Sequence, residues 1–180
     1  MNIFGKPNHQ RGTSALDLIS TLSVSLTLMT LGVPAVQNLT TSSSMSSAIN
    51  TMGTHLNIAR SEAITRNRYT ALCPSNDGQQ CLDDFAWHGG FILFVDADKD
   101  KVRDAGEQVL RTYQPESNHT KIFTTTGRRV IQYKPSGILA GFSNTTFTFC
   151  DPGEKLAPKK ITIRNGRLHY SDDGDSSRCL

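Results

Sequence analysis

The chain has 180 residues, of which 37% are hydrophobic and 19% are charged. This balance fits one globular domain with a soluble surface and an N-terminal extension, and it excludes a chain that is low in complexity throughout. The net charge of +3 is too small to indicate nucleic-acid binding by itself. The position of the basic residues therefore matters more than their number.

The N-terminal segment joins a short basic leader to an apolar run. Residues 1–11 contain Lys6 and Arg11 and no acidic residue. Residues 18–36 carry no charge, and a helix of that length spans roughly 28 Å, about the thickness of the bilayer core. Six of these residues are serine or threonine, whose hydroxyls bond back to helix carbonyls, so the segment is a weak membrane span. Because basic flanks stay cytoplasmic, we expect the C-terminal domain outside.

The start of this run, RGTSALDLIS at 11–20, resembles the processing signature of type IV prepilins. That resemblance implies cleavage between Gly12 and Thr13, methylation of the new amino terminus, and retention of the helix as an assembly spine. Counted from Thr13, which replaces the usual Phe, Asp17 is the fifth residue, where the family has Glu. Pro34 is the twenty-second, where a proline commonly kinks the helix. We expect Asp17 to pair with the free amine of a neighbouring subunit, and an uncleaved signal anchor is the alternative.

Apolar residues after the Ser/Thr-rich patch at 40–47 recur with helical spacing. The pattern predicts one long helix, roughly 14–66, loosened near Gly32–Pro34, whose second half packs on a sheet. A coiled-coil seam is the alternative, but its alanines would leave such a seam thin. The residues of this stripe are Met45, Ile49, Met52, Leu56, Ala59 and Ala63.

Short β-type runs separated by Gly, Asn, Asp and Pro follow Arg68, and Asn165-Gly166 between two of them predicts a tight hairpin. The expected class is α+β, with a long N-terminal helix packed on an antiparallel sheet. The expected segments are a leader at 1–12, a hydrophobic transmembrane and assembly helix at 13–40, and a periplasmic globular domain at 41–180. The predicted strands are 69–73, 91–95, 108–113, 130–134, 145–150, 160–163 and 167–170.

The four cysteines fall into two separated pairs without the C-x-x-C spacing of a zinc site. Their even number, together with the membrane-targeting N-terminus, indicates an oxidising compartment and disulfides. We predict the pairs Cys73–Cys81 and Cys150–Cys179. Two other connectivities are possible, and four reduced thiols are the alternative to any disulfide.

The middle of the chain narrows the resemblance. ARSEAITRNRYTALCPSNDGQQC (59–81), WHGGFILFVDADKDKVRDAGEQVLR (87–111) and FTFCD (147–151) are similar, in order and spacing, to the GspH/FimT family of minor pilins and pseudopilins. The resemblance implies a non-enzymatic subunit without a cofactor that initiates assembly at a pilus tip. Its partners would be other major and minor pilins, prepilin peptidase and the inner membrane. A type II secretion pseudopilin with a purely structural role is the alternative.

FimT-like members of the family are associated with DNA binding during uptake by naturally competent bacteria, through a C-terminal Gly-Arg-x-Arg motif. In this chain the motif stands as Gly166-Arg167-Leu168-His169, inside a basic hairpin at 155–170. Neutral His weakens phosphate binding, so other cations must share its face. A solvated basic face is the alternative, because acids follow at 171–175. The candidate contacts to double-stranded DNA are Lys160, Arg164, Gly166, Arg167 and His169, with Arg128 and Arg129 as a second contact.

The loop 95–107 matches part of a calcium-binding template, in which Lys101 replaces the glycine of the sharp turn. We favour a polar loop between two strands over a metal site. Ser61, Glu62 and His55 form no nucleophile or paired-carboxylate motif, so we expect no enzymatic activity. The weak calcium candidates are Asp96, Asp98, Asp100, Asp104 and Glu107.

Overall fold

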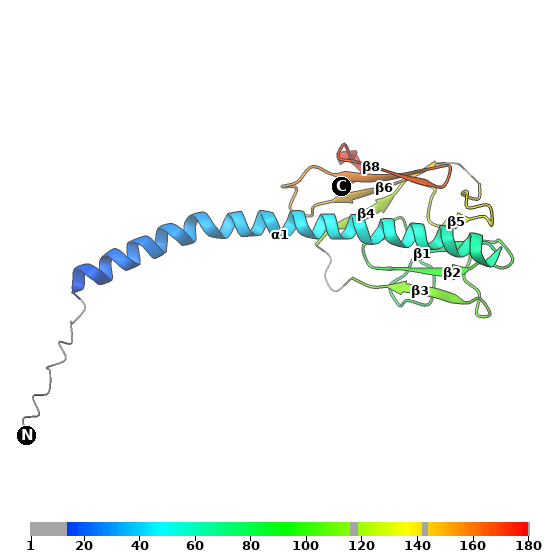
Figure 1. The fold of residues 1–180 in the computed structure, drawn as a ribbon, viewed down its shortest axis with the longest axis horizontal. Coiled ribbons are helices and arrows are strands. Elements are labelled where there is room, and N and C mark those ends of the chain that lie inside the picture. Colours follow the sequence, from blue (N-terminus) through cyan, green and yellow to red (C-terminus); the bar gives the residue numbers. More distant parts are fainter. Residues whose placement is uncertain (1–13, 116–118, 142–143, 180) are drawn as a thin grey trace, which may run out of the picture. The chain divides into compact units, whose positions relative to one another are not determined.

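The computed structural model describes residues 14–115, 119–141 and 144–179. The chain divides into two compact units, Met1–Leu39 and Thr40–Leu180, which are described separately. The elements, shown in Figure 1, are α1 (Ala15–Arg66), β1 (Thr70–Pro74), β2 (Phe91–Val95), β3 (Val109–Tyr113), β4 (Lys121–Thr124), β5 (Ile131–Tyr133), β6 (Asn144–Cys150), β7 (Lys159–Arg164), β8 (Arg167–Ser171) and the 3₁₀ turn η1 (Ser176–Arg178).

The first unit consists of the beginning of α1. The helical backbone continues through Gly32 and Pro34, so the proline does not end the helix, and a bend at Pro34 stays a prediction. No helix among the described residues combines the length and hydropathy that crossing a membrane requires. The membrane span expected within 13–40 is therefore not confirmed.

In the second unit, α1 buries one face against the sheets, as its sequence spacing predicts. Met52, Leu56, Ala59 and Ala63 are fully buried, and Ile49 is partly buried. They belong to one cluster with apolar residues from both sheets. Burial of each large side chain stabilises the fold by roughly 1.5–3 kcal/mol, so this face anchors the helix to the unit.

The strands form two four-stranded antiparallel sheets, with the orders β3-β2-β1-β5 and β4-β6-β7-β8 (Figure 1). All seven predicted strands are present, but the sequence did not divide them between two sheets. The eighth strand, β4, was missed. Of its four residues Ile122 and Thr124 are buried and Phe123 is partly buried, and Ile122 pairs with the distant Phe149. Local sequence carries little signal for so short a strand.

The predicted hairpin joins β7 to β8. Asn165 and Gly166 both have positive φ, of 49° and 75°, as a two-residue type I′ turn requires. Gly166 is also buried against the loop that follows β5, where a Cβ would collide with the carbonyl oxygen of Gly137. The turn therefore needs glycine for two reasons: its backbone conformation and the close approach of a second loop.

Candidate functional site

Both predicted disulfides are present in the second unit. Cys73 at the end of β1 is bonded to Cys81, eight residues later, and Cys150 at the end of β6 is bonded to Cys179. The second bond ties the C-terminal segment to the sheet that carries the basic hairpin. The covalent frame therefore fixes where the acids at 171–175 lie relative to that hairpin.

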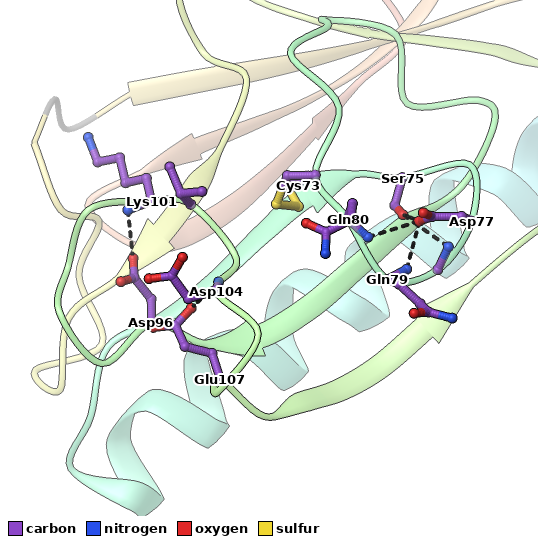
Figure 2. The surroundings of a disulfide bond; sticks show 12 residues. Cys73, Ser75, Asp77, Gln79, Gln80, Asp96, Lys101, Asp104 and Glu107 are labelled. Atoms are coloured by element: carbon purple, nitrogen blue, oxygen red, sulfur yellow. Dashed lines mark hydrogen bonds between the residues drawn. A yellow bond between two sulfur atoms is a disulfide. The ribbon is translucent and has the colours of Figure 1, made fainter.

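The loop closed by Cys73–Cys81 is held by one exposed carboxylate (Figure 2). Asp77 accepts hydrogen bonds from the backbone N–H groups of Gln80 and Gln79, at 2.9 and 2.8 Å, and from the Ser75 hydroxyl at 3.0 Å. These bonds, the one from Gln80 foremost, hold the pKa of Asp77 below its usual value. The carboxylate therefore organises this loop.

The acidic loop between β2 and β3 is built around a buried carboxylate (Figure 2). Asp96 accepts hydrogen bonds from the Lys99 and Lys101 N–H groups, at 2.7 and 3.2 Å, and from the Gln132 side-chain amide. Burial raises the pKa of Asp96 above its usual value. Lys101 has a φ of 69°, so it adopts the left-handed conformation that glycine supplies in the calcium template.

The other acids of this loop also bind its own backbone. Asp98 accepts from the Asp100 N–H at 3.3 Å, and Asp100 accepts from the Val102 N–H at 2.7 Å. Glu107 accepts from the N–H groups of Ala97 and Asp104, at 2.6 and 3.2 Å. The carboxylates of Asp96, Asp98 and Glu107 gather closely, as do those of Asp98, Asp100 and Asp104. This internal bonding fits the polar loop that the sequence favours.

Asp17 closes the first turn of α1. The Ser14 hydroxyl accepts a hydrogen bond from the Leu16 N–H at 3.4 Å, and the Asp17 carboxylate accepts one from the Ser14 N–H at 3.3 Å. This reciprocal arrangement is a capping box, and an acid in the first turn also favours the helix dipole. The spacing Ser14-x-x-Asp17 carried this signal, which the sequence interpretation missed.

The first unit exposes an apolar surface whose polar groups are internally satisfied. The hydroxyls of Ser20, Thr21, Ser23, Ser25 and Thr27 all donate to carbonyls of the preceding helical turn, as the sequence predicts. Such bonds lower the cost of placing these residues in an apolar environment. The exposed apolar side chains are Leu16, Leu18, Ile19, Leu22, Val24, Leu26, Leu28, Met29 and Leu39.

The register of the β7–β8 hairpin gathers four candidate residues on one face. Arg164 pairs with Arg167, and directly paired residues point to the same side of a sheet. Ile161 and Ile163 of β7 are buried in the core, so the residues that alternate with them face outwards. The outer face therefore carries Lys160, Arg164, Arg167 and His169.

The base and the tip of this hairpin differ in charge compensation. At the base, Lys159 pairs with Asp172 and Lys160 with Asp173, each at 3.0 Å. At the tip, Arg164 and Arg167 are exposed, and neither forms an ion pair within the described parts of the chain. The available positive charge is therefore concentrated at the tip.

Arg128 and Arg129 follow β4 at the same end of the sheet as the hairpin tip. Thr124, the last residue of β4, pairs with Phe147 of β6. The first residue of β6, Asn144, lies near this end and pairs with Arg164 of β7. Arg129 is engaged locally, because it pairs with Asp83 and its guanidinium lies 5.0 Å from the centre of the Phe85 ring. The residues of the second predicted contact therefore follow β4 at the end of the sheet that carries the hairpin tip, and Arg129 is paired with an acid.

The three helix residues that the sequence offered as catalytic candidates form no catalytic group with one another. The Nδ1 atom of His55 lies 2.9 Å from the Thr51 carbonyl oxygen, and its ring packs edge-on against Phe91 at 5.0 Å. Glu62 pairs with Arg66 one helical turn later. Ser61 is exposed on the same helix. These contacts bring no nucleophile and base together.

Residues 48–167 match the family model described as type II transport protein GspH, which covers well over half of the chain. The chain belongs to the GspH family. The pilin-like protein PilA1 of Thermus thermophilus is 25% identical over 159 residues, which cover 86% of this chain and 93% of that protein.

The fold agrees with this family assignment. The minor type IV pilin FimU of Pseudomonas aeruginosa superimposes with a TM-score of 0.58 at 21% identity, covering 72% of this chain and 89% of that chain. A second crystal form of FimU gives a TM-score of 0.55 over 70% and 91%. The family match makes the chain a minor pilin or pseudopilin, and not an enzyme.

Two of the family's processing residues, Gly12 and Thr13, lie outside the described residues. Within the described part, the structure assigns capping to Asp17 and places four hairpin candidates on one face. The GspH match ends at residue 167, so it includes the turn of the hairpin and only the first residue of β8.

Proposed function

We propose that this GspH-family protein is a minor type IV pilin that helps to initiate assembly at the pilus tip. Prepilin peptidase removes the leader between Gly12 and Thr13. The mature protein waits in the inner membrane as a single-pass protein with its globular unit in the periplasm. The exposed apolar helix surface and its internally bonded hydroxyls support this proposal, since both suit a helix that packs among other pilin helices.

Asp17 has two tasks in this proposal. Its carboxylate caps its own helix, and it attracts the free amine of a neighbouring subunit. Asp17→Asn keeps one acceptor oxygen for the cap and removes the charge. We expect normal leader removal but lower incorporation into pili, measured by the ratio of pilus-bound to membrane-bound protein. Equal incorporation of Asp17→Asn and the wild type would contradict the pairing.

The finer part of the proposal is that the hairpin tip binds double-stranded DNA during uptake. The observation that carries it is the pair of uncompensated arginines, Arg164 and Arg167, on one exposed face. Guanidinium groups bind phosphates without reading base sequence, which suits uptake of varied DNA. His169 on the same face supplies a further hydrogen-bonding group.

A mobility-shift experiment tests DNA binding with the full-length protein in neutral detergent. We expect a shift of duplex DNA at low salt that weakens at moderate salt, because phosphate binding releases counterions. Arg164→Ala combined with Arg167→Ala should strongly weaken the shift, whereas Lys159→Ala, on the same strand, should retain most of it. No shift even at low salt would remove DNA binding and leave the assembly role standing.

A structural pseudopilin of a type II secretion system is the second candidate, favoured by the description of the matching family model. Deletion of the gene separates the two. Loss of surface pili with secretion intact supports the pilin proposal. Loss of secretion with pili intact supports the pseudopilin.

A further inference from the structure

β8 is an open edge of its sheet. It is the outermost strand in the order β4-β6-β7-β8 and is drawn in orange-red in Figure 1. An edge strand presents unpaired backbone groups that another chain can pair with. The strand has five residues, Arg167–Ser171, which pair with β7 in regular register and without a bulge.

The other outer strands are covered or distorted. On the outer side of β4, the Ile122 carbonyl accepts a hydrogen bond from the Trp87 N–H at 2.8 Å. The outer side of β5 is bonded by the Ala140 N–H to the Gln132 carbonyl, also at 2.8 Å. At β3 the register shifts, and the Arg111 guanidinium bonds the Leu110 carbonyl at 2.7 Å. Among the outer strands of the described sheets, β8 is therefore the one whose edge is both regular and uncovered.

The register identifies the groups that β8 offers. In a two-residue hairpin the closing pair, here Arg164 and Arg167, exchanges hydrogen bonds, and bonded and non-bonded pairs then alternate. Leu168 and Tyr170 stand in the non-bonded pairs, so their N–H and C=O groups point away from β7. No hydrogen bond reaches these four groups from elsewhere in the described chain.

The side chains of β8 give this edge a definite chemistry. Arg167 and His169 point to the outer face, and Leu168 and Tyr170 point to the face that packs on the core and α1. Tyr170 is 56% exposed, so part of its ring is available to a neighbouring strand. An added strand would therefore meet a guanidinium and an imidazole on one face and apolar groups on the other.

We propose that the edge of β8 binds an extended, acidic segment of a partner protein, which adds to the sheet as a further strand. The segment alternates acidic residues, facing Arg167 and His169, with apolar residues, facing Leu168 and Tyr170. Backbone hydrogen bonds to β8 supply affinity, and the alternating side chains supply specificity. This surface is a protein-docking site and goes beyond the proposed binding of DNA.

Charge complementarity favours an acidic partner. Arg167 at the tip end of this edge is exposed and forms no ion pair within the described residues, so an acidic side chain of an added strand can pair with it. Asp172 and Asp173 lie at the far end of β8, where they are paired with Lys159 and Lys160. The acidic residues of the partner are therefore best placed near Arg167, towards the hairpin tip.

Space for such a strand exists beside β8. A cleft between α1 and the end of the hairpin is lined by Ser46, Asn50, Tyr170 and Asp172. Its walls also include Lys159 and Lys160, so they carry hydroxyl, amide, carboxylate and ammonium groups that suit the polar backbone of an extended peptide. The cleft therefore borders the Tyr170 end of β8.

The test uses the full-length protein in neutral detergent and a capped six-residue peptide of alternating Glu and Val. Two control peptides are an alternating Lys and Val peptide and a peptide with three Glu followed by three Val. We expect the Glu–Val peptide to slow amide exchange at Leu168 and Tyr170 and to bind roughly tenfold more tightly than either control. Unchanged exchange at both amides overturns the proposal.

A matched pair of variants isolates the backbone contribution. Tyr170→Ala and Tyr170→Pro both remove the ring, but only proline removes the outward N–H, which an edge strand tolerates. We expect Tyr170→Pro to bind the Glu–Val peptide at least about fivefold more weakly than Tyr170→Ala, the loss of one hydrogen bond. Equal binding by the two overturns strand addition. If Tyr170→Pro does not fold, Arg167→Glu must reverse the preference towards the Lys–Val peptide, and an unchanged preference overturns the proposal.

DNA binding provides the separation from the proposed function. Tyr170→Pro should shift duplex DNA as the wild type does. A failure of peptide docking would therefore leave the DNA proposal intact, and an absent DNA shift would leave the docking proposal intact. If duplex DNA rather than peptide slows exchange at Leu168 and Tyr170, the edge belongs to nucleic acid and the docking proposal is wrong. If exchange slows with protein concentration alone, a second copy occupies the edge and the acidic partner is wrong.

Discussion

The base and the tip of the β7–β8 hairpin carry two cations each in different surroundings. Lys159 and Lys160 at the base are paired with acids of the C-terminal segment, whereas Arg164 and Arg167 at the tip are not paired within the described chain. A count of basic residues in the sequence treats all four as equal. The structure shows that a disulfide-held acidic segment neutralises one end and leaves the other available.

The largest expected effect comes from removing the bond that holds this segment. Cys150→Ala with Cys179→Ala should lower the free energy of unfolding by about 4 kcal/mol, because the bond closes a 29-residue separation. Denaturant titration measures this loss, and Cys73→Ala with Cys81→Ala is the matched comparison. With a separation of only eight residues, this second bond should contribute about 1 kcal/mol less. A larger loss for the shorter loop would contradict the entropic account.

Substitution of the glycine in the tip should have the next largest effect. Gly166→Ala is strained by its positive φ and also collides with the Gly137 carbonyl, so we expect a loss of about 2–4 kcal/mol. Gly127→Ala is the control, because Gly127 also has positive φ but has open space where a Cβ would lie. Its loss should be only about 1–2 kcal/mol. Equal losses would show that the contact with Gly137 contributes nothing.

Neutralising the two acids at the base of the hairpin should change the free energy of unfolding little but should change DNA affinity. Asp172 and Asp173 are 85% and 75% exposed, so solvent screens both ion pairs and each contributes little to stability. Asp172→Asn with Asp173→Asn should nevertheless raise DNA affinity at low salt, since two lysines become available for phosphate. Titration with labelled duplex measures this gain, and unchanged affinity would mean that the base lies outside the DNA footprint.

The smallest expected effect is a pH dependence of stability at the base. The hydroxyl of Ser171 and the ammonium of Lys160 hold the pKa of Asp173 below its usual value. A carboxyl whose pKa is lowered on folding adds stability above its unfolded pKa, and this is lost as the pH falls through its folded pKa. Relative to Asp173→Asn, the wild type should therefore lose stability on acidification below about pH 4. Parallel curves for the two proteins would refute the linkage.

Much of the fold follows from local pattern. The apolar stripe from Met45 to Ala63 fixes the buried face of α1, and Asn165-Gly166 fixes the hairpin. Each of these signals is carried by residues that are close to one another in the sequence. β4 and the division into two sheets depend on pairings such as Ile122 with Phe149, which no local window contains. Strand order is a property of long-range contacts, so the sequence predicted strands but not their grouping.

The candidate site shows the same division. Alternation along β7 and β8 predicts which residues share a face with Arg167, given the hairpin. The pairing of Lys160 with Asp173 depends on the path of the chain after Ser171 and on the distant Cys150. Asp17 is the opposite case, since its capping role was readable from Ser14-x-x-Asp17 and was overlooked in favour of its family role.

The most direct test of the central claim compares the salt dependence of DNA binding after equal charge removal at the two ends. The slope of log affinity against log salt should fall by about two for Arg164→Ala with Arg167→Ala. It should change by much less for Lys159→Ala with Lys160→Ala, whose charges are already paired. Equal slopes for the two double variants, or a larger change at the base, would contradict a DNA site at the hairpin tip.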